Sequence, residues 1–600
     1  MIRPRNIPSP KRGRSPERRE IVTDLQSARI MARAWSQTVP ERQRHQAAWA
    51  FIKAAIDEYI RRSNISISIS APAIALSFCL DSTVLDLARA IGDEAARLSI
   101  EQASYQLSAT YTALVPAGTR SELGMYYTPP ALTDRLLDMA EEAGIDWRTA
   151  RVLDPACGGG AFLLPVAMRM IAASEDLSPA ERLRTITNRL QGFEIDPFAG
   201  WLTQTWLEIG LADLLAQTGA KLPQLVKVCD TLAQEPNGAL FDLVIGNPPY
   251  GRLPLSPEQR RRFSRSLYGH ANLYGVFTDV AMRWAEITGV IAYVTPTSFL
   301  GGEYFKALRS LLAQDAPPFA IDFIEARRGV FEDVLQETLL ATYKRNQAID
   351  DTAVHYLSVS SDASAEITHA GHFKIPGDPS SPWLAPRRPK HQDLINRLAQ
   401  MPHRLADWGY RVSTGPLVWN RFKSQLRERP GSNTYPLIWA EAVAGPGRFV
   451  HRANKRNHQP FFEITEIDEW LKVSVPCVLV QRTTAKEQPR RLIAAEMPDS
   501  FIKLHGAVVV ENHLNMIRPD CAERRPKVDT AILSAVMNSS VVDEAFRCIS
   551  GSVAVSAFEL EALPLPAPDQ MRRLKTLIDA GACVETIDAC VRMLYNETSA

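Results

Sequence analysis

The residues best suited to chemistry form one short segment, Asn247-Pro-Pro-Tyr250, which directly follows the largely apolar run Phe241–Gly246. The run predicts a buried β-strand. Each proline fixes its own φ angle and favours an extended conformation in the residue before it, so a stiff turn is expected after the strand. The turn presents the amide oxygen of Asn247, the carbonyl of Pro248 and the ring of Tyr250. Two hydrogen-bond acceptors beside an aromatic ring suit a planar group that carries an NH2, such as a nucleobase.

The exocyclic amine of adenine is a poor nucleophile because its lone pair is delocalised into the ring. Acceptors that bind both amine hydrogens draw the nitrogen towards tetrahedral geometry, so positioning and electrostatics can replace a strong base. The ring of Tyr250 can stack on the base, which is worth ~1–3 kcal/mol and offsets part of the cost of pulling a base from a duplex. Stacking uses the ring, so the hydroxyl is predicted to be dispensable. The alternative interpretation is a proline-rich strand exit followed by a surface tyrosine.

Three acidic residues are expected at the ends of further strands. Asp154 follows Val152-Leu153 and precedes the loop Gly158-Gly-Gly160, whose glycines let the backbone approach a ligand closely. A glycine loop between a strand and a helix is typical of nucleotide cofactors, although this one is neither a GxGxxG nor a P-loop, and the carboxylate of Asp154 favours a cationic cofactor. Glu194 is placed to bind ribose hydroxyls, and Asp230 an adenine amine. One acidic residue at a strand end is usually only solvated, whereas three at successive strand ends indicate a site.

The composition is that of a globular protein, with 46% hydrophobic and 22% charged residues among 600, so two or three domains are expected. The net charge is +1, so any binding to nucleic acid must come from local basic patches. Eight cysteines are scattered without a CxxC pair, which predicts neither a disulfide framework nor a metal site and fits a reducing cytoplasm. No apolar run has the length of a membrane span, and neither a membrane nor a signal peptide is expected.

Changes in composition along the chain predict its organisation. The ranges expected are a disordered basic tail (1–20), a helical region without recognisable chemistry (21–120), a catalytic domain (121–350), a linker or crossing segment (351–400), a DNA-binding domain (401–565) and a C-terminal helical tail (566–600). Basic residues interleaved with aromatic and amide residues in the fifth range suit DNA contact. The predicted contacts are Arg482, Lys486, Arg490 and Arg491. The alternative is that each basic cluster is an ordinary solvated face.

With these motifs in view, the chain resembles the N6-adenine DNA methyltransferases of restriction–modification systems, in the γ-class, TaqI-like group. The resemblance implies that the loop from Asp154 binds S-adenosylmethionine, that Asn247-Pro-Pro-Tyr250 is the catalytic tetrapeptide, and that the ring of Phe331 packs on a flipped adenine. The lysine that follows this Phe in some relatives is not evident here, where Val334 stands. The residues that the resemblance assigns to the cofactor are Thr128, Asp154, Ala156, Gly158, Gly160, Glu194, Ile195, Asp230 and Asn247.

The resemblance also implies a fold and partners. The expected fold is α/β, a class I, Rossmann-like methyltransferase with a seven-stranded, mainly parallel sheet, an N-terminal helical extension and a C-terminal mixed α/β target-recognition domain. The expected partners are double-stranded DNA and a separately encoded restriction endonuclease, because no lysine in the chain has an acidic residue two positions before it, as a PD-(D/E)xK nuclease requires. Two other interpretations stay open: a methyltransferase that acts on RNA or protein, and a catalytically silent DNA-specificity subunit.

Overall fold

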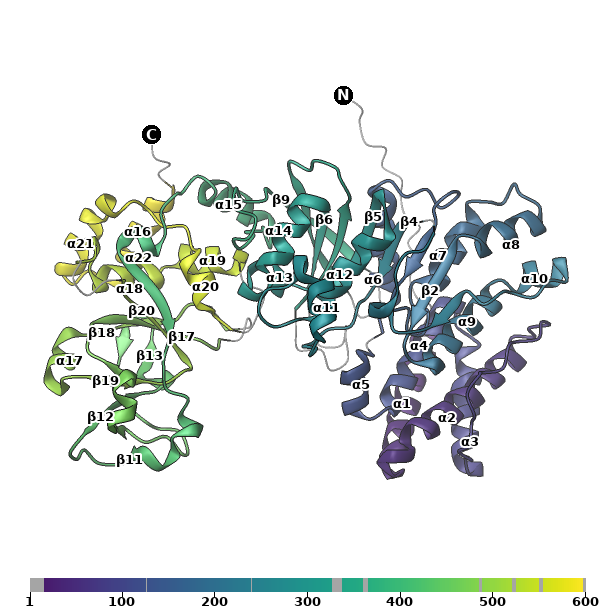
Figure 1. The fold of residues 1–600 in the computed structure, drawn as a ribbon, viewed down its shortest axis with the longest axis horizontal. Helices are drawn as coiled ribbons and strands as arrows, with labels where there is room; N and C mark the ends of the chain where they lie inside the picture. The colour runs from purple at the N-terminus through teal and green to yellow at the C-terminus, as the bar shows by residue number, and fades with distance from the viewer. Residues whose placement is uncertain are drawn as a thin grey trace. The chain divides into compact units, whose positions relative to one another are not determined.

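The computed structural model describes residues 16–125, 127–238, 240–325, 337–359, 365–484, 488–520, 525–549 and 554–596. The chain forms two compact units (Figure 1). The first contains the described residues up to Thr295, together with Gln314–Ile349 and Tyr356–Thr368. The second contains Pro296–Ala313, Asp350–His355 and the described residues from His369 onward. Among the helices of the described residues, none combines the length and apolar character that a bilayer crossing requires.

The first unit begins with a set of helices in the range expected to be helical. They are α1 (Pro16–Thr38), α2 (Glu41–Arg62), α3 (Ser82–Ala95), α4 (Ile100–Leu114) and α5 (Ala117–Leu123). Because α1 starts at Pro16, residues 16–20 are helical rather than part of a disordered tail, and residues 1–15 lie outside the described residues. Phe51 and Leu107 of these helices pack in one core with Phe198 and Trp206 of α9 (Pro197–Gly210). The helical region therefore packs directly against a helix of the α/β fold.

A nine-stranded sheet has the order β3-β2-β1-β4-β5-β7-β6-β8-β9, and most of its residues belong to the first unit. Its strands are β1 (Val152–Asp154), β2 (Leu190–Glu194), β3 (Val226–Val228), β4 (Phe241–Gly246), β5 (Ala285–Pro296), β6 (Pro318–Ile324), β7 (Thr338–Lys344), β8 (Thr352–Val359) and β9 (Ala365–Phe373). Strands β1 to β5 pair in parallel, whereas β6 and β7 pair antiparallel. The helices that accompany them are α6 (Pro130–Glu142), α7 (Leu163–Ala172), α8 (Pro179–Thr187), α9, α10 (Ala212–Thr218), α11 (Pro257–Arg262) and α12 (Leu273–Trp284).

The expectation of seven strands is corrected by β8 and β9, which extend the sheet to nine and whose residues lie in the range expected to be a linker. Strand β8 has the alternation of a half-buried strand, since Thr352 and Val354 are buried while Ala353 and His355 are partly exposed. The many serine, histidine and alanine residues of this range hid the alternation. The range expected to be a linker is thus largely ordered secondary structure.

The second unit is a mixed α/β structure. A four-stranded sheet has the order β10-β20-β17-β18, beside a five-stranded sheet, β11-β15-β12-β19-β16, and a two-stranded sheet, β13-β14. The strands are β10 (Tyr410–Thr414), β11 (Leu426–Arg427), β12 (Thr434–Ile438), β13 (Val443–Gly445), β14 (Arg448–Phe449), β15 (Phe461–Glu463), β16 (Lys472–Val473), β17 (Cys477–Gln481), β18 (Ala494–Met497), β19 (Val508–Val510) and β20 (Leu514–Pro519). The helices are α13 (Ser298–Gly301), most of α14 (Lys306–Asp315), α15 (Gln392–Leu398), α16 (Leu405–Trp408), α17 (Asp499–His505), α18 (Thr530–Met537), α19 (Ser540–Ile549), α20 (Ala557–Glu561), α21 (Arg572–Asp579) and α22 (Val584–Asn596).

The C-terminal helices are part of the core of the second unit and not a tail. Leu574 of α21 and Val591 of α22 are completely buried, in one cluster with Trp408 and Phe546. Tyr595 is also buried, and its hydroxyl donates to the carbonyl of Pro564 at 2.9 Å. Apolar residues of α21 and α22 therefore complete a core that begins nearly two hundred residues earlier in the chain, at Leu394.

We expect Tyr595→Ala to lower the free energy of unfolding by about 3–5 kcal/mol, the range for removing a large buried aromatic side chain. Tyr595→Phe, which keeps the ring and loses one hydrogen bond, should cost about 1 kcal/mol. Chemical denaturation followed by circular dichroism measures both variants. If Tyr595→Ala unfolded at the denaturant concentration of the wild type, α22 would be a tail after all.

Candidate active site

A cavity of about 300 Å³ lies in the first unit at the carboxyl ends of β1, β2, β3 and β4. The chain order changes direction between β1 and β4, the kind of switch point at which open α/β sheets bind ligands. Among the residues predicted from sequence, those that line the cavity are Thr128, Ala156, Gly158, Glu194, Ile195, Asp230 and Asn247. The cavity also has an apolar wall, which includes Tyr127, Phe162, Leu253 and Phe277.

Asp154 is buried beneath the cavity, at the end of β1. Its Oδ1 accepts a hydrogen bond from the backbone N–H of Ala156 at 3.0 Å, and its Oδ2 has no partner among the described residues. The next strand approaches so closely that a Cβ on Gly246 would lie 2.7 Å from Oδ1, so only glycine fits there. Burial raises the pKa of Asp154 to about 8. The carboxylate is therefore costly to ionise unless a cationic group comes near it.

Glu194 is held at the end of β2 by backbone donors. Its Oε2 accepts from the N–H of Gly158 at 2.8 Å, and its Oε1 accepts from the N–H groups of Ile195 and Asp196, each at 2.9 Å. Burial nevertheless raises the pKa of Glu194 to about 7, although these hydrogen bonds act in the opposite direction. Both oxygens thus have fixed positions at the wall of the cavity.

Two neighbours of Glu194 complete this part of the wall. The side chain of Ile195 is 52% exposed, which is high for a large apolar residue and gives the cavity an apolar surface. Asp230 follows β3, and its Oδ1 accepts from the N–H of Leu232 at 2.9 Å. The three acidic residues expected at strand ends therefore lie along one edge of the sheet, where Asp154 and Glu194 are buried and Asp230 is exposed.

The glycine loop is pressed between the N-terminal helices and the segment before α6. A Cβ on Gly159 would lie 2.5 Å from Oγ of Ser108, which belongs to α4, and 2.7 Å from the ring of Tyr127. Gly158 and Gly160 have φ angles of 53° and 87°, in the left-handed region that favours glycine. The three glycines are thus required by close packing and by backbone conformation.

The N-terminal helices also fix the loop after Glu194, a role that the sequence did not reveal. The hydroxyl of Tyr111 donates to Oδ2 of Asp196 at 2.7 Å, while Oδ1 of Asp196 accepts from the N–H of Phe198 at the start of α9. Trp49 Nε1 donates to the same hydroxyl at 3.0 Å, and His45 Nε2 lies 2.9 Å from it. Because the single proton of Tyr111 is given to Asp196, His45 must carry its own proton on Nε2. Burial lowers the pKa of His45, which keeps the imidazole neutral near pH 7.

The amide of Asn247, in the turn after β4, has a hydrogen-bond partner at each end. Nδ2 of Asn247 donates to Oγ1 of Thr128 at 3.2 Å, and the hydroxyl of Tyr250 donates to Oδ1 of Asn247 at 2.7 Å. The Tyr250 oxygen also lies 3.2 Å from the carbonyl oxygen of Val294, at the end of β5. Pro248 is buried. Phe331, predicted as the second aromatic ring, lies outside the described residues, as does Val334.

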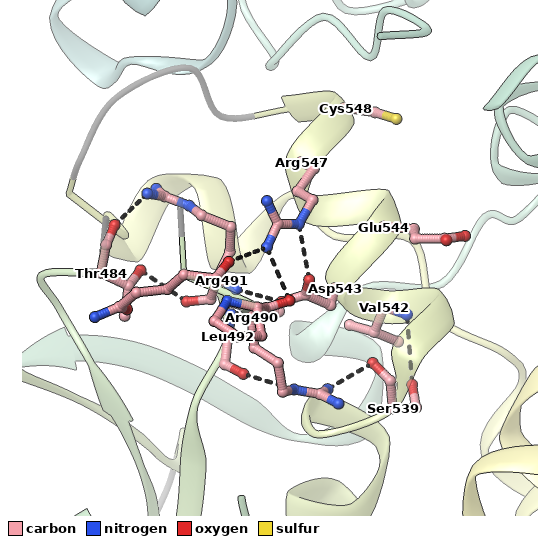
Figure 2. A network of polar contacts seen from close by, with 12 residues as sticks. Thr484, Arg490, Arg491, Leu492, Ser539, Val542, Asp543, Glu544, Arg547 and Cys548 are labelled. Atoms are coloured by element: carbon pink, nitrogen blue, oxygen red, sulfur yellow. Dashed lines mark hydrogen bonds and ion pairs between the residues drawn. The ribbon is translucent and has the colours of Figure 1, made fainter. Parts of the chain in front are cut away.

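The predicted DNA contacts in the second unit are corrected in part by a buried polar network (Figure 2). Arg491 is only 2% exposed, and its guanidinium donates to the carbonyl of Thr484. Arg490 is partly exposed and donates to the carbonyl of Ser539 at 3.0 Å. The prediction that Arg491 contacts DNA is therefore wrong, because this side chain is buried inside the unit. Arg482 is partly exposed, with one donor 3.1 Å from the carbonyl of Asn512, and Lys486 lies outside the described residues.

Asp543 of α19 is the centre of this network. Its Oδ1 accepts from the backbone N–H groups of Arg491 at 2.6 Å and Leu492 at 2.8 Å, and its Oδ2 accepts from Nε of Arg547 at 2.9 Å (Figure 2). Asp543 is 5% exposed. A sequence shows the charges of Arg490 and Arg491 but not that a helix fifty residues later supplies the acceptor for the backbone N–H of Arg491.

We expect Asp543→Ala to lower the free energy of unfolding by about 2–4 kcal/mol, since it leaves buried donors without an acceptor. The matched control is Asp579→Ala, which removes an exposed carboxylate 3.7 Å from Lys575 and should cost less than about 1 kcal/mol. Denaturation midpoints of the two variants provide the measurement. Equal midpoints would show that the network around Asp543 contributes no more than a surface ion pair.

Comparison with known proteins relates most of the chain to one group. Residues 216–331 match the family described as Eco57I restriction-modification methylase. The Type II methyltransferase M.BsuBI of Bacillus subtilis is 25% identical over 461 residues, which cover 75% of this chain and 89% of the relative. The Type II methyltransferase M.PstI of Providencia stuartii is 26% identical over 367 residues, 58% of this chain and 69% of the relative.

Among solved structures, the Type IIL restriction-modification enzyme MmeI in complex with DNA has a similar fold. It matches with a TM-score of 0.52 at 12% identity and covers 98% of this chain and 94% of that one. The DrdV–DNA complex matches with a TM-score of 0.51 at 11% identity, over 94% of this chain and 73% of that one. By its sequence and its fold, the chain is therefore related to the methylases of Type II restriction–modification systems.

Proposed function

We propose that this protein is a site-specific DNA methyltransferase that transfers a methyl group from S-adenosylmethionine to N6 of an adenine flipped out of duplex DNA. The observation that carries the proposal is the position of Asn247: its amide stands at the carboxyl end of β4, on the wall of the cavity that Glu194 also lines. An acceptor for an amine and a carboxylate for a ribose therefore face one cavity.

The residues around the cavity fit S-adenosylmethionine. Both carboxylate oxygens of Glu194 are fixed by backbone donors, as binding of a ribose diol requires, and Ile195 and Asp230 offer an apolar surface and an acceptor for an adenine. The Oδ2 atom of Asp154, buried and without a partner among the described residues, favours a cationic group. When bound, S-adenosylmethionine supplies an electrophilic methyl group. Thr128, Ala156 and Gly158, which line the cavity, would complete its surroundings, whereas Gly160 does not line the cavity and would act only through the shape of the loop.

Two groups at the turn after β4 would orient the substrate amine. Oδ1 of Asn247 and the carbonyl of Pro248 accept its two hydrogens and localise the nitrogen lone pair, and this stabilisation by fixed dipoles needs no strong base. The ring of Tyr250 would stack on the extrahelical base, with Phe331 as its expected counterpart. Each group acts by position, which agrees with an amide held at both ends.

The second unit would recognise DNA, and a separate endonuclease would cleave it. Support for DNA as the substrate comes from the methylases to which the chain is related and from the fold shared with enzymes solved on DNA. Arg482 stays a candidate contact. The sequence lacks the acid–lysine pair of a PD-(D/E)xK nuclease, which supports a separately encoded endonuclease as partner.

Asn247→Ala should abolish methyl transfer to duplex DNA and leave the Kd for S-adenosylmethionine within about threefold, because the amide serves the substrate amine. Transfer of a labelled methyl group gives kcat, and calorimetry gives Kd. A variant that keeps more than about a tenth of wild-type kcat, a change below ~1.4 kcal/mol in the barrier, would contradict the role of Asn247.

The affinity for S-adenosylmethionine should rise as the pH rises from about 6 to 8. Glu194 has a raised pKa of about 7, and only its ionised form accepts from both ribose hydroxyls. The stability of the free protein should fall over the same pH range. A carboxyl group whose pKa is raised in the folded state stabilises that state at pH values below the unfolded pKa, and this stabilisation is lost as the pH rises through 7. Kd measured by calorimetry across this range, with Glu194→Gln as the control, checks the sign. Affinity that fell with rising pH would remove Glu194 from the ribose site.

A further inference from the structure

Two hydroxyl groups contact the Asn247 amide, one at each end, and base stacking accounts for neither contact. Tyr250 presents its hydroxyl to Oδ1 at 2.7 Å, and Thr128 presents its hydroxyl to Nδ2 at 3.2 Å. Thr128 is 2% exposed, so its hydroxyl has little competition from water. An amide that is held at both ends by different side chains has one preferred orientation about its last torsion angle.

That orientation decides whether the amide can serve an amine. With Oδ1 turned towards Tyr250, the oxygen has a second lone pair with which it can accept from a substrate N–H. If the amide turned by half a rotation, it would present N–H donors to a group that is itself a donor. In the first orientation the Tyr250 hydroxyl can donate to Oδ1 of Asn247. In the second it must donate to the carbonyl oxygen of Val294, at 3.2 Å, which is its only other acceptor in the described part of the chain.

The geometry favours the orientation that presents the oxygen. The Tyr250 oxygen is nearer to Oδ1 of Asn247, at 2.7 Å, than to the carbonyl of Val294, at 3.2 Å, and the shorter distance is the better hydrogen bond. Burial raises the pKa of Tyr250 above its usual range, so the hydroxyl keeps its proton and donates. Thr128 can donate or accept. Of these two hydroxyls, only that of Tyr250 distinguishes the oxygen of the amide from its nitrogen.

We propose that the hydroxyls of Tyr250 and Thr128 are positioning groups that lock the Asn247 amide with its oxygen towards the substrate amine. This inference rests on the proposed adenine methyltransferase activity. It changes the expectation drawn from the sequence, in which only the ring of Tyr250 acts. The tyrosine has two separable tasks: the ring stacks on the base, and the hydroxyl orients the acceptor. Thr128 connects the cavity wall to the acceptor, since it lines the cavity and also contacts Asn247.

The test separates the hydroxyl from the ring. Tyr250→Phe should lower the single-turnover rate about fivefold to tenfold at saturating DNA and S-adenosylmethionine, which corresponds to the loss of one hydrogen bond of about 1 kcal/mol. Base flipping, followed by the fluorescence of 2-aminopurine at the target position, should be unchanged, because the ring remains. The matched control is Tyr595→Phe, which removes a buried hydroxyl bonded to a carbonyl in the second unit and should leave the rate unchanged.

Thr128 gives an independent second arm if Tyr250→Phe does not fold. Thr128→Val keeps the shape of the side chain and removes the hydroxyl, so its saturated rate should fall about fivefold, and Thr128→Ser should restore it. A Tyr250→Phe rate within twofold of wild type would overturn the positioning role, and so would a Thr128→Val rate equal to that of Thr128→Ser. Failure of the proposed function itself is a different result, in which the wild-type protein transfers no methyl group to adenine.

Discussion

The site depends on the burial of two carboxylates at the ends of adjacent parallel strands. Asp154 and Glu194 are 1% and 8% exposed, and among the described residues neither forms an ion pair with a basic side chain. Backbone N–H groups stabilise them only in part, so burial raises the pKa of both. A cavity with one such carboxylate on its wall and another buried close by suits a cationic, hydroxyl-bearing ligand, which is the kind of ligand that we propose. The strand order, the glycine loop and the close approach of Gly246 hold these two carboxylates in fixed positions.

The helical region before the sheet is part of the same arrangement. Without Tyr111, the carboxylate of Asp196 would lose its only side-chain donor recorded in the described part of the chain, and Asp196 is the residue whose N–H bonds Glu194. The packing of Ser108 against Gly159 has a similar effect on the other loop. The N-terminal helices, which carry no recognisable chemistry, therefore determine the geometry of residues that do. On the acceptor side, Thr128 and Tyr250 do the same for Asn247.

Much of the site could be predicted because its signals are local. A short apolar run followed by Asn-Pro-Pro-Tyr specifies a strand and a stiff turn, and β4 does cover Phe241–Gly246. The acids at strand ends were predicted to converge because parallel strands have their carboxyl ends on one edge. What could not be predicted depends on distant partners: Arg491 is a basic residue in the sequence but lies buried against α19, and Tyr111 meets Asp196 across 85 positions. Strands β8 and β9 were missed because polar residues obscured their alternation.

The central claim is that adenine in DNA is the substrate. The most direct measurement is expression of the protein in a host without adenine methylation, followed by sequencing of the host DNA for modified bases. Our account predicts N6-methyladenine at every copy of one defined sequence, and unmodified DNA when the Asn247→Ala variant is expressed. Methylation of cytosine instead, or unmodified DNA from cells in which the wild-type protein is folded and transfers methyl groups to RNA or protein, would contradict it.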